Sequence, residues 1–203
     1  MTDQQSAPES ATTEPRRLTD AKEMRALAHP VRVALLELLA RDGPMTATEA
    51  GEALGESPAN TSFHLRTLAK HGFVEEAPGG TGRQRPWQRV GRATSFELDS
   101  DDAATAAAAQ GLADHFARRN YERQQQWEAT RSSYPQVWRE ASFASVALTY
   151  LTPDELRELG EEIIALATRF ADRVTDPGAR PDGASPVAIA ATGFPLPPTA
   201  RGN

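Results

Sequence analysis

The sequence predicts a mainly α-helical protein with a small β component, and three observations lead to this fold class. Apolar residues recur at helical spacing from Leu18 onward. A Gly-rich basic loop at 78–86 separates two strand-like runs, at 73–77 and 87–98. Residues 101–131 contain no Pro and a single Gly and are rich in Ala, Gln and Arg, which favours one long helix.

Composition divides the 203 residues into three parts. Residues 1–17 are rich in Ser, Thr, Pro and Glu, and we expect them to be a disordered tail. Residues 18–99 carry the pattern of a compact domain, and residues 100–203 form a C-terminal region. The chain has no Cys, which excludes disulfides and thiolate metal sites.

Helix-start signals predict four helices before residue 72. The signals are capping residues and first-turn prolines. In chain order they are Thr19 or Asp20, then Pro30, then the T-x-x-E pair Thr46 and Glu49, and then Ser57 with Pro58. Turn residues end the second helix at 42–44, the third at Gly55 and the fourth at Gly72. Four helices with a short turn before the last one, followed by a hairpin, follow the winged helix-turn-helix plan.

The fourth helix has the character of a DNA recognition helix. Its inward stripe would be Thr61, Leu65 and Leu68. A capped N-terminus directs backbone N–H groups at a phosphate, and small side chains let a helix enter the major groove. The candidate contact residues are Ser57, Pro58, Ala59, Asn60, Ser62, His64, Arg66 and Lys70. Asn60 fits an adenine edge, whereas Arg66 and Lys70 fit phosphates. The alternative is an ordinary amphipathic surface helix.

Charge is distributed unevenly along the chain, whose net charge is −6. Residues 57–92 contain six Lys or Arg against two Glu, a net charge of +4 with His neutral, which leaves −10 for the rest. Such a basic island suits a confined phosphate-binding surface. In the hairpin loop, Arg83, Gln84 and Arg85 form a candidate wing for the minor groove, with a solvated basic loop as the alternative.

Residues 24–75 resemble the ArsR-type winged-helix repressors through LAHPVR at 27–32, SPANTSFHLRTL at 57–68 and GFV at 72–74. The resemblance implies a homodimer that binds a palindromic operator, and it is greatest with longer, actinobacterial-looking relatives that carry an appended C-terminal region. The metal-sensing members use Cys pairs or His and acidic clusters, whereas the four His here are scattered at His29, His64, His71 and His115. We therefore expect no metal and no other cofactor. His29 fits a structural position at a helix entry, and His64 is either DNA-facing or partly packed.

The C-terminal region holds nine of the thirteen aromatic residues. Apolar runs at 143–151 and 186–196 are predicted to be strands that bracket a helix starting at 152–155. We therefore expect a C-terminal dimerisation region that is helical or αβ. The aromatic residues suit either a dimer core or a pocket for an apolar effector. No catalytic constellation is visible, so an enzyme is not expected.

The sequence thus predicts a DNA-binding transcriptional regulator that acts as a homodimer on double-stranded DNA. The alternative function is a winged-helix protein–protein interaction module without DNA binding. No run of about 18 apolar residues and no signal peptide is seen, so we expect a cytoplasmic protein, nucleoid-associated when bound to DNA, without a membrane partner.

Overall fold

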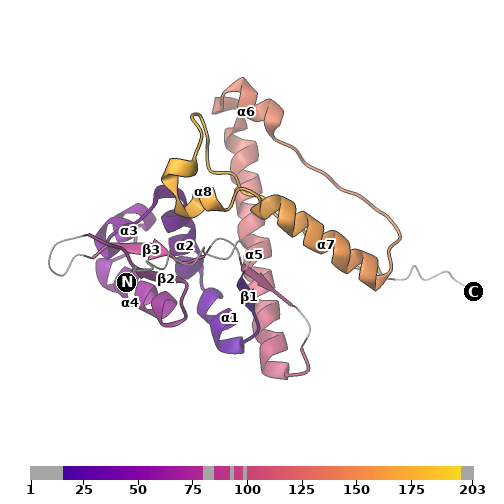
Figure 1. Cartoon of the computed structure of the whole chain (residues 1–203), viewed down its shortest axis with the longest axis horizontal. Coiled ribbons are helices and arrows are strands. Elements are labelled where there is room, and N and C mark those ends of the chain that lie inside the picture. Colours follow the sequence, from indigo (N-terminus) through magenta and orange to yellow (C-terminus); the bar gives the residue numbers. More distant parts are fainter. Residues whose placement is uncertain (1–15, 80–84, 92–93, 98–99, 198–203) are drawn as a thin grey trace, which may run out of the picture.

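The computed structural model describes residues 16–79, 85–91, 94–97 and 100–197. Its N-terminal half contains strand β1 (Arg16–Leu18), helices α1 (Ala21–Leu27), α2 (Pro30–Asp42), α3 (Ala47–Leu54) and α4 (Pro58–Lys70), and strands β2 (Val74–Glu76), β3 (Trp87–Arg89) and β4 (Thr94–Phe96). Its C-terminal half contains α5 (Ala103–Thr130), η1 (Arg131–Ser133), α6 (Gln136–Ala141), α7 (Pro153–Thr168), α8 (Asp172–Thr175) and η2 (Pro177–Ala179) (Figure 1). The predicted fold class, mainly helical with a small strand component, is confirmed.

The helices begin where local capping chemistry predicts. Asp20 caps α1 by accepting a hydrogen bond from the backbone N–H of Lys22 at 2.6 Å. Thr46 and Glu49 form a complete capping box at the start of α3. These contacts satisfy N–H groups that would otherwise lack partners at the helix N-termini. Each helix start before the wing is therefore determined by residues within one turn of it.

Two small sheets flank the helices. In the wing, β2 pairs antiparallel with β3, and Met45 adds a single bridge to Trp87. β1 pairs in parallel with β4, which places Leu18 opposite Phe96. Leu18 is only 1 % exposed, because this pairing lays it on the core.

Two expectations about these strands are wrong. The disordered tail was expected to reach residue 17, but Arg16 and Arg17 belong to β1 because β4 offers them a hydrogen-bonding edge. The second strand-like run was expected over 87–98, but it contains two strands, β3 and β4, that join different sheets. Between them Gly91 has a φ of +74°, a conformation that glycine adopts without steric cost.

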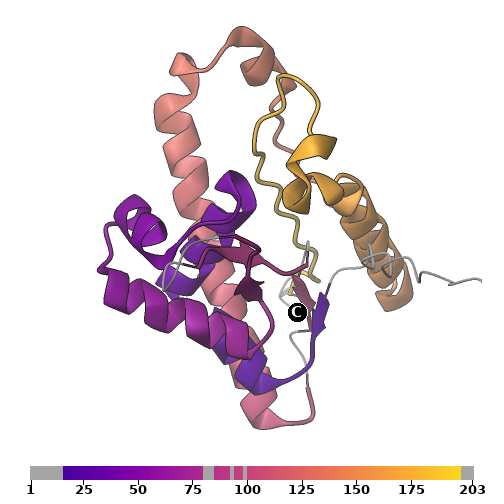
Figure 2. The same cartoon turned by 60° about the vertical axis from the view of Figure 1, so that its left-hand side comes forward.

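One apolar core joins the winged helix to the first half of α5. Leu35, Leu65 and Leu112 are each fully buried in the same cluster, and α1 lies along the start of α5 in both cartoon views (Figures 1 and 2). The expected boundary at residue 99 is therefore not a boundary of packing. The compact unit extends through the N-terminal half of α5.

In the C-terminal half of α5, charged residues replace apolar ones on the same side of the helix. Arg119 pairs with Glu37 of α2 at 3.1 Å, and Arg123 pairs with the other oxygen of the same carboxylate. Leu112, Phe116, Arg119 and Arg123 follow one another at three- and four-residue spacing. This stripe, apolar at one end and basic at the other, holds α5 against the winged helix.

The C-terminal region is helical, and the expectation of two strands in it is wrong. α7 begins with the predicted capping box of Thr152 and Glu155, but 143–151 and 186–196 form no strand in the structure. The two runs have no ladder partner, and Val146 and Tyr150 are 100 % exposed. An apolar run becomes a strand only where another edge satisfies its backbone groups. Across the described ranges, no helix combines the length and the hydropathy needed to cross a membrane.

Candidate nucleic-acid interface

Helix α4 presents one face to the core and the opposite face outward. Thr61, Leu65 and Leu68, the predicted inward stripe, are each 0 % exposed. Ser57 caps the helix through a 3.2 Å hydrogen bond that its hydroxyl accepts from the backbone N–H of Asn60. The buried stripe fixes which side chains can reach a ligand, and the cap fixes where the helix starts.

Most of the predicted contact residues lie on the accessible side of α4. Ser57, Pro58 and Ala59 are exposed around the helix N-terminus. Farther along the helix, the half-exposed Asn60 and Ser62 and the exposed Arg66 and Lys70 continue this surface. It is small and polar at its start and basic at its end, which suits entry into a groove with phosphates on its walls.

His64 is the exception among the predicted contacts. Its side chain is only 5 % exposed, and its ring lies 4.4 Å from the ring of His29 at the start of α2. This burial agrees with the partly packed alternative for His64 and leaves little of its side chain accessible to DNA in this conformation. His29 has the expected structural role, because its Nδ1 atom accepts a hydrogen bond from the backbone N–H of Val31 at 3.2 Å.

Phe63 is an accessible residue of α4 that was not among the contact residues predicted from the sequence. It is 60 % exposed, between the small residues at the start of the helix and Arg66. Its spacing of four from Ala59 and three from Arg66 places it on the outer face, and this spacing could have revealed it. An outward aromatic ring can make apolar contact with the methyl group of thymine.

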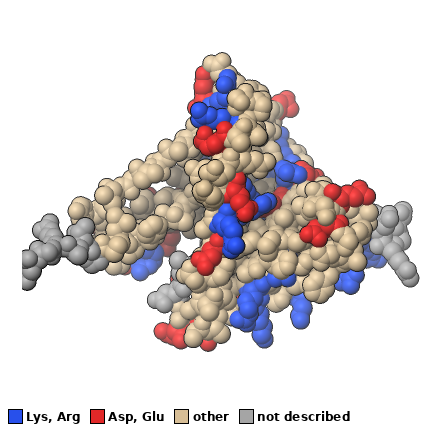
Figure 3. Space-filling view, turned by 180° about the vertical axis from the view of Figure 1, so that it is seen from behind, with Lys and Arg blue, Asp and Glu red and all other residues tan. Residues whose placement is uncertain are grey.

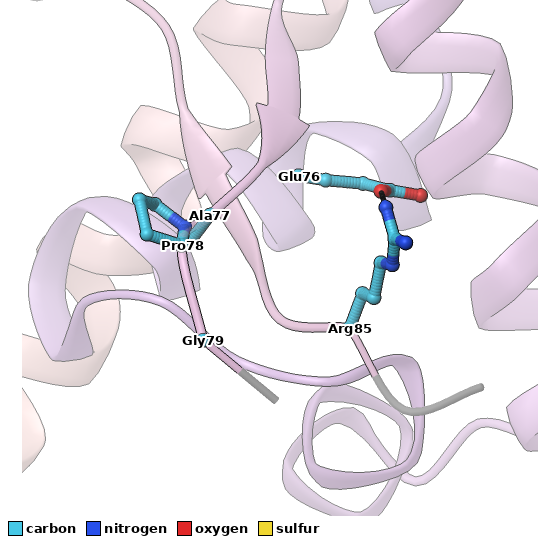
Figure 4. A pocket seen from close by; sticks show the side chains of 5 residues that line it. All are labelled: Glu76, Ala77, Pro78, Gly79 and Arg85. Carbon is cyan, nitrogen blue, oxygen red and sulfur yellow. Dashed lines mark hydrogen bonds and ion pairs between the residues drawn. The ribbon is translucent and has the colours of Figure 1, made fainter. Parts of the chain in front are cut away.

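Two carboxylates hold the polar groups of this surface in place. The Nδ2 atom of Asn60 donates a hydrogen bond to Glu56 at 2.7 Å. In the wing, Arg85 forms a 2.7 Å ion pair with Glu76, and Figure 4 shows its guanidinium group pointing at that carboxylate. The side chain of Arg85 is 65 % exposed, so phosphate can compete for it. Arg83 and Gln84, the other predicted wing residues, lie outside the described residues.

Basic side chains gather on one side of the winged-helix part. Figure 3 shows Lys and Arg along its lower edge, on the right of that view, where few Asp or Glu side chains lie. The carboxylates of Glu75 and Glu76 are engaged by Gln88 at 2.8 Å and by Arg85. The acidic residues of the basic island are thus paired within the wing.

Three histidines, on α4, on α5 and before α2, predict a stability that depends on pH. Burial, followed by the charge of neighbouring groups, lowers the pKa of His29, His64 and His115 below the ordinary value of 6.5. The unfolded chain therefore takes up protons first, so stability is lost as pH falls below about 6.5. We expect a lower urea midpoint at pH 5.5 than at pH 7.5. A His64→Gln variant should reduce this difference, and an equal midpoint at both pH values would contradict the prediction.

Comparison with known families agrees with this geometry. Residues 27–77 match the family model described as a helix-turn-helix domain. The match extends from the end of α1 to the residue after β2 and therefore includes all of α4. The comparison with curated proteins gives no match. The chain contains a helix-turn-helix domain, and the class of protein that this domain defines is the DNA-binding transcriptional regulator.

Proposed function

We propose that this protein is an ArsR-type transcriptional regulator that binds a palindromic operator as a homodimer. The observation that carries the proposal is the outer face of α4, where an accessible surface with a capped N-terminus and the basic residues Arg66 and Lys70 lies over a fully buried stripe. The helix enters the major groove, and the wing reaches the adjacent minor groove. It acts in the cytoplasm, where the operator DNA is accessible.

Surfaces suited to dimer formation lie beyond the shared core. Tyr121 on the second half of α5 is 61 % exposed, and Tyr134, which follows η1, is 47 % exposed. A two-fold symmetric pair would place the two α4 helices about 34 Å apart, one turn of DNA. Exposed apolar surface of this kind on a helical region supports association with a second copy.

Selection of bound duplexes from a random pool tests the proposal. Full-length protein should enrich one sequence whose two halves are inverted repeats about 10 base pairs apart. Enrichment of a single non-repeated site would contradict the homodimer. Binding to no duplex at any salt concentration would favour the protein–protein module instead.

Asn60 and Arg85 should contribute differently to binding. We expect Asn60→Ala to relax the preference at one base pair by about 1–3 kcal/mol, because the amide can read a base edge. We expect Arg85→Ala to weaken specific and random DNA alike and to reduce the salt slope by about 1, because a guanidinium group near phosphate displaces one counterion. Fluorescence anisotropy at several salt concentrations measures both effects.

The exposed Arg139 on α6 provides the matched control for the arginine variant. Arg139→Ala should leave affinity and salt slope unchanged, since α6 lies outside the helix-turn-helix domain. Equal losses on specific and random duplexes for both Asn60→Ala and Arg85→Ala would refute the division of roles.

A further inference from the structure

A hollow of about 460 Å³ lies between the α1–α2 junction and the middle of α5. Ala28 and Pro30 line it from the junction, and Gly111 lines it from α5. A Cβ atom added to Gly111 would meet no atom within 4 Å, so the space above this residue is open. Ligand pockets typically have volumes of about 300–1,000 Å³ and mostly apolar walls with a few polar groups. The hollow has the size of such a site, and its apolar wall is limited to Ala28, Pro30 and Gly111.

The polar groups of the hollow come from the next turns of α5. Arg119 is already paired with Glu37 and, at 3.5 Å, with Glu122. Arg118 is exposed and has no ion-pair partner within the described ranges. Because Arg119 is already neutralised by these carboxylates, Arg118 is the lining cation that can attract an anion to this end of the hollow.

His115 lines the same hollow, and the protein covers its unsatisfied Nε2 atom. Its Nε2 atom is buried and has no hydrogen-bond partner in the described part of the chain. Burial, together with the charges of Arg118 and Arg119, lowers the pKa of His115, so the imidazole is neutral at pH 7. A neutral imidazole can donate one hydrogen bond, and a buried donor left without a partner is costly. A carboxylate oxygen in the hollow would satisfy it only after the ring turns, because less than 1 Å² of the Nε2 atom is exposed.

The hollow lies next to the His29–His64 contact, through which the start of α2 packs against α4. His29 stands between the lining residues Ala28 and Pro30, and its ring contacts that of His64 on α4. The Nδ1 atom of His64 and the Nε atom of Arg32 are also buried without hydrogen-bond partners in the described ranges. A ligand that moves the α1–α2 junction would therefore reach α4 through a single ring contact.

We propose that this hollow binds an organic carboxylate with an apolar body and that the ligand acts as an effector of DNA binding. Arg118 holds the carboxylate by a charge-assisted contact, and the His115 ring turns to donate to it from the Nε2 atom that the protein now covers. The apolar body lies against Ala28, Pro30 and Gly111. The effector role rests on the proposed function, whereas the binding itself does not require DNA.

Calorimetric titration of the full-length protein without DNA tests the site. Benzoate, 2-naphthoate and decanoate are the probes, each paired with its neutral amide. We expect at least one carboxylate to bind saturably with one site per chain and its amide to bind about tenfold more weakly, since charged hydrogen bonds are the stronger ones. Absence of saturable binding for all three carboxylates, or equal binding of acid and amide, would overturn the proposal.

Two variants locate the binding. At Gly111 an added Cβ meets no atom within 4 Å, and leucine is a better helix former than glycine, so Gly111→Leu should fold, occupy the hollow and abolish binding. Arg118→Ala should weaken the carboxylate about tenfold and leave the amide unchanged. Gly160→Leu on α7, where an added Cβ is equally unobstructed, and Arg139→Ala are the matched controls, and both should bind like the wild type. Unchanged binding in Gly111→Leu would place the ligand elsewhere and refute the site.

The effector role is measured separately from the site. Operator affinity, determined with and without the bound carboxylate, should change in the wild type and stay constant in Gly111→Leu. An unchanged affinity with the ligand bound would refute the effector role alone. A protein that binds the carboxylate but no duplex would refute the proposed function and leave the ligand site standing.

Discussion

Leu112→Ala should lower the free energy of unfolding by about 2–5 kcal/mol, the usual cost of a leucine-to-alanine change in a packed core. Leu112 lies on α5 and is 0 % exposed in the cluster that also contains Leu35 and Leu65. Removing its side chain leaves a cavity where the long helix meets the winged helix. Urea denaturation followed by circular dichroism and tryptophan fluorescence measures the change.

Leu166→Ala is the matched control, because it makes the same chemical change at a helical leucine that is 61 % exposed. Its effect should stay within about 0.5 kcal/mol. Similar midpoints for Leu112→Ala and wild type would mean that α5 does not share the winged-helix core. A loss confined to one spectroscopic probe would mean that the two parts unfold separately.

Gly51→Val should disrupt the turn between α3 and α4 and with it DNA binding. A Cβ atom at Gly51 would lie 2.8 Å from the carbonyl oxygen of Glu56 and 3.0 Å from Oγ1 of Thr61. The same turn is closed by a 2.8 Å hydrogen bond from the backbone N–H of Glu56 to the Gly51 carbonyl. The clash is with backbone, so α4 must shift, at a cost of about 1–3 kcal/mol or more. Urea midpoints and operator affinity measure both consequences.

Gly160→Val on α7 separates the clash from the general effect of valine in a helix. An added Cβ there meets no atom within 4 Å, so this variant should retain the wild-type midpoint to within about 1 kcal/mol. Gly51→Val with a normal midpoint and normal DNA affinity would show that α3 and α4 can separate without loss.

The locally encoded features of the winged helix were predictable. Thr46 with Glu49, and Ser57 with Pro58, mark helix starts through contacts within one turn. The stripe of Thr61, Leu65 and Leu68 follows the helical period, which holds for any helix that covers a core. From these signals the inner and outer faces of α4 follow, and with them most of the candidate DNA-contacting residues.

The environment of His64 could not be predicted from helical periodicity. His64 stands directly before Leu65, at the edge between the inner and outer faces of α4, and helical spacing alone permits either environment. The ring of His29 decides its burial, and that residue precedes it by 35 positions on another helix. The Arg85–Glu76 pair likewise joins residues nine positions apart across the wing, whereas Asn60 and Glu56 have the four-residue spacing of helix neighbours.

The sequence by itself determined the helix starts, the faces of α4 and the basic island, because capping, periodicity and charge act over a few neighbouring residues. Only the tertiary structure decided that β1 pairs with β4 across the chain, that α5 belongs to the winged-helix core, and that the runs at 143–151 and 186–196 form no strand. Strand pairing and core membership depend on partners far away in sequence, since a backbone edge or an apolar face is stabilised only where another segment covers it.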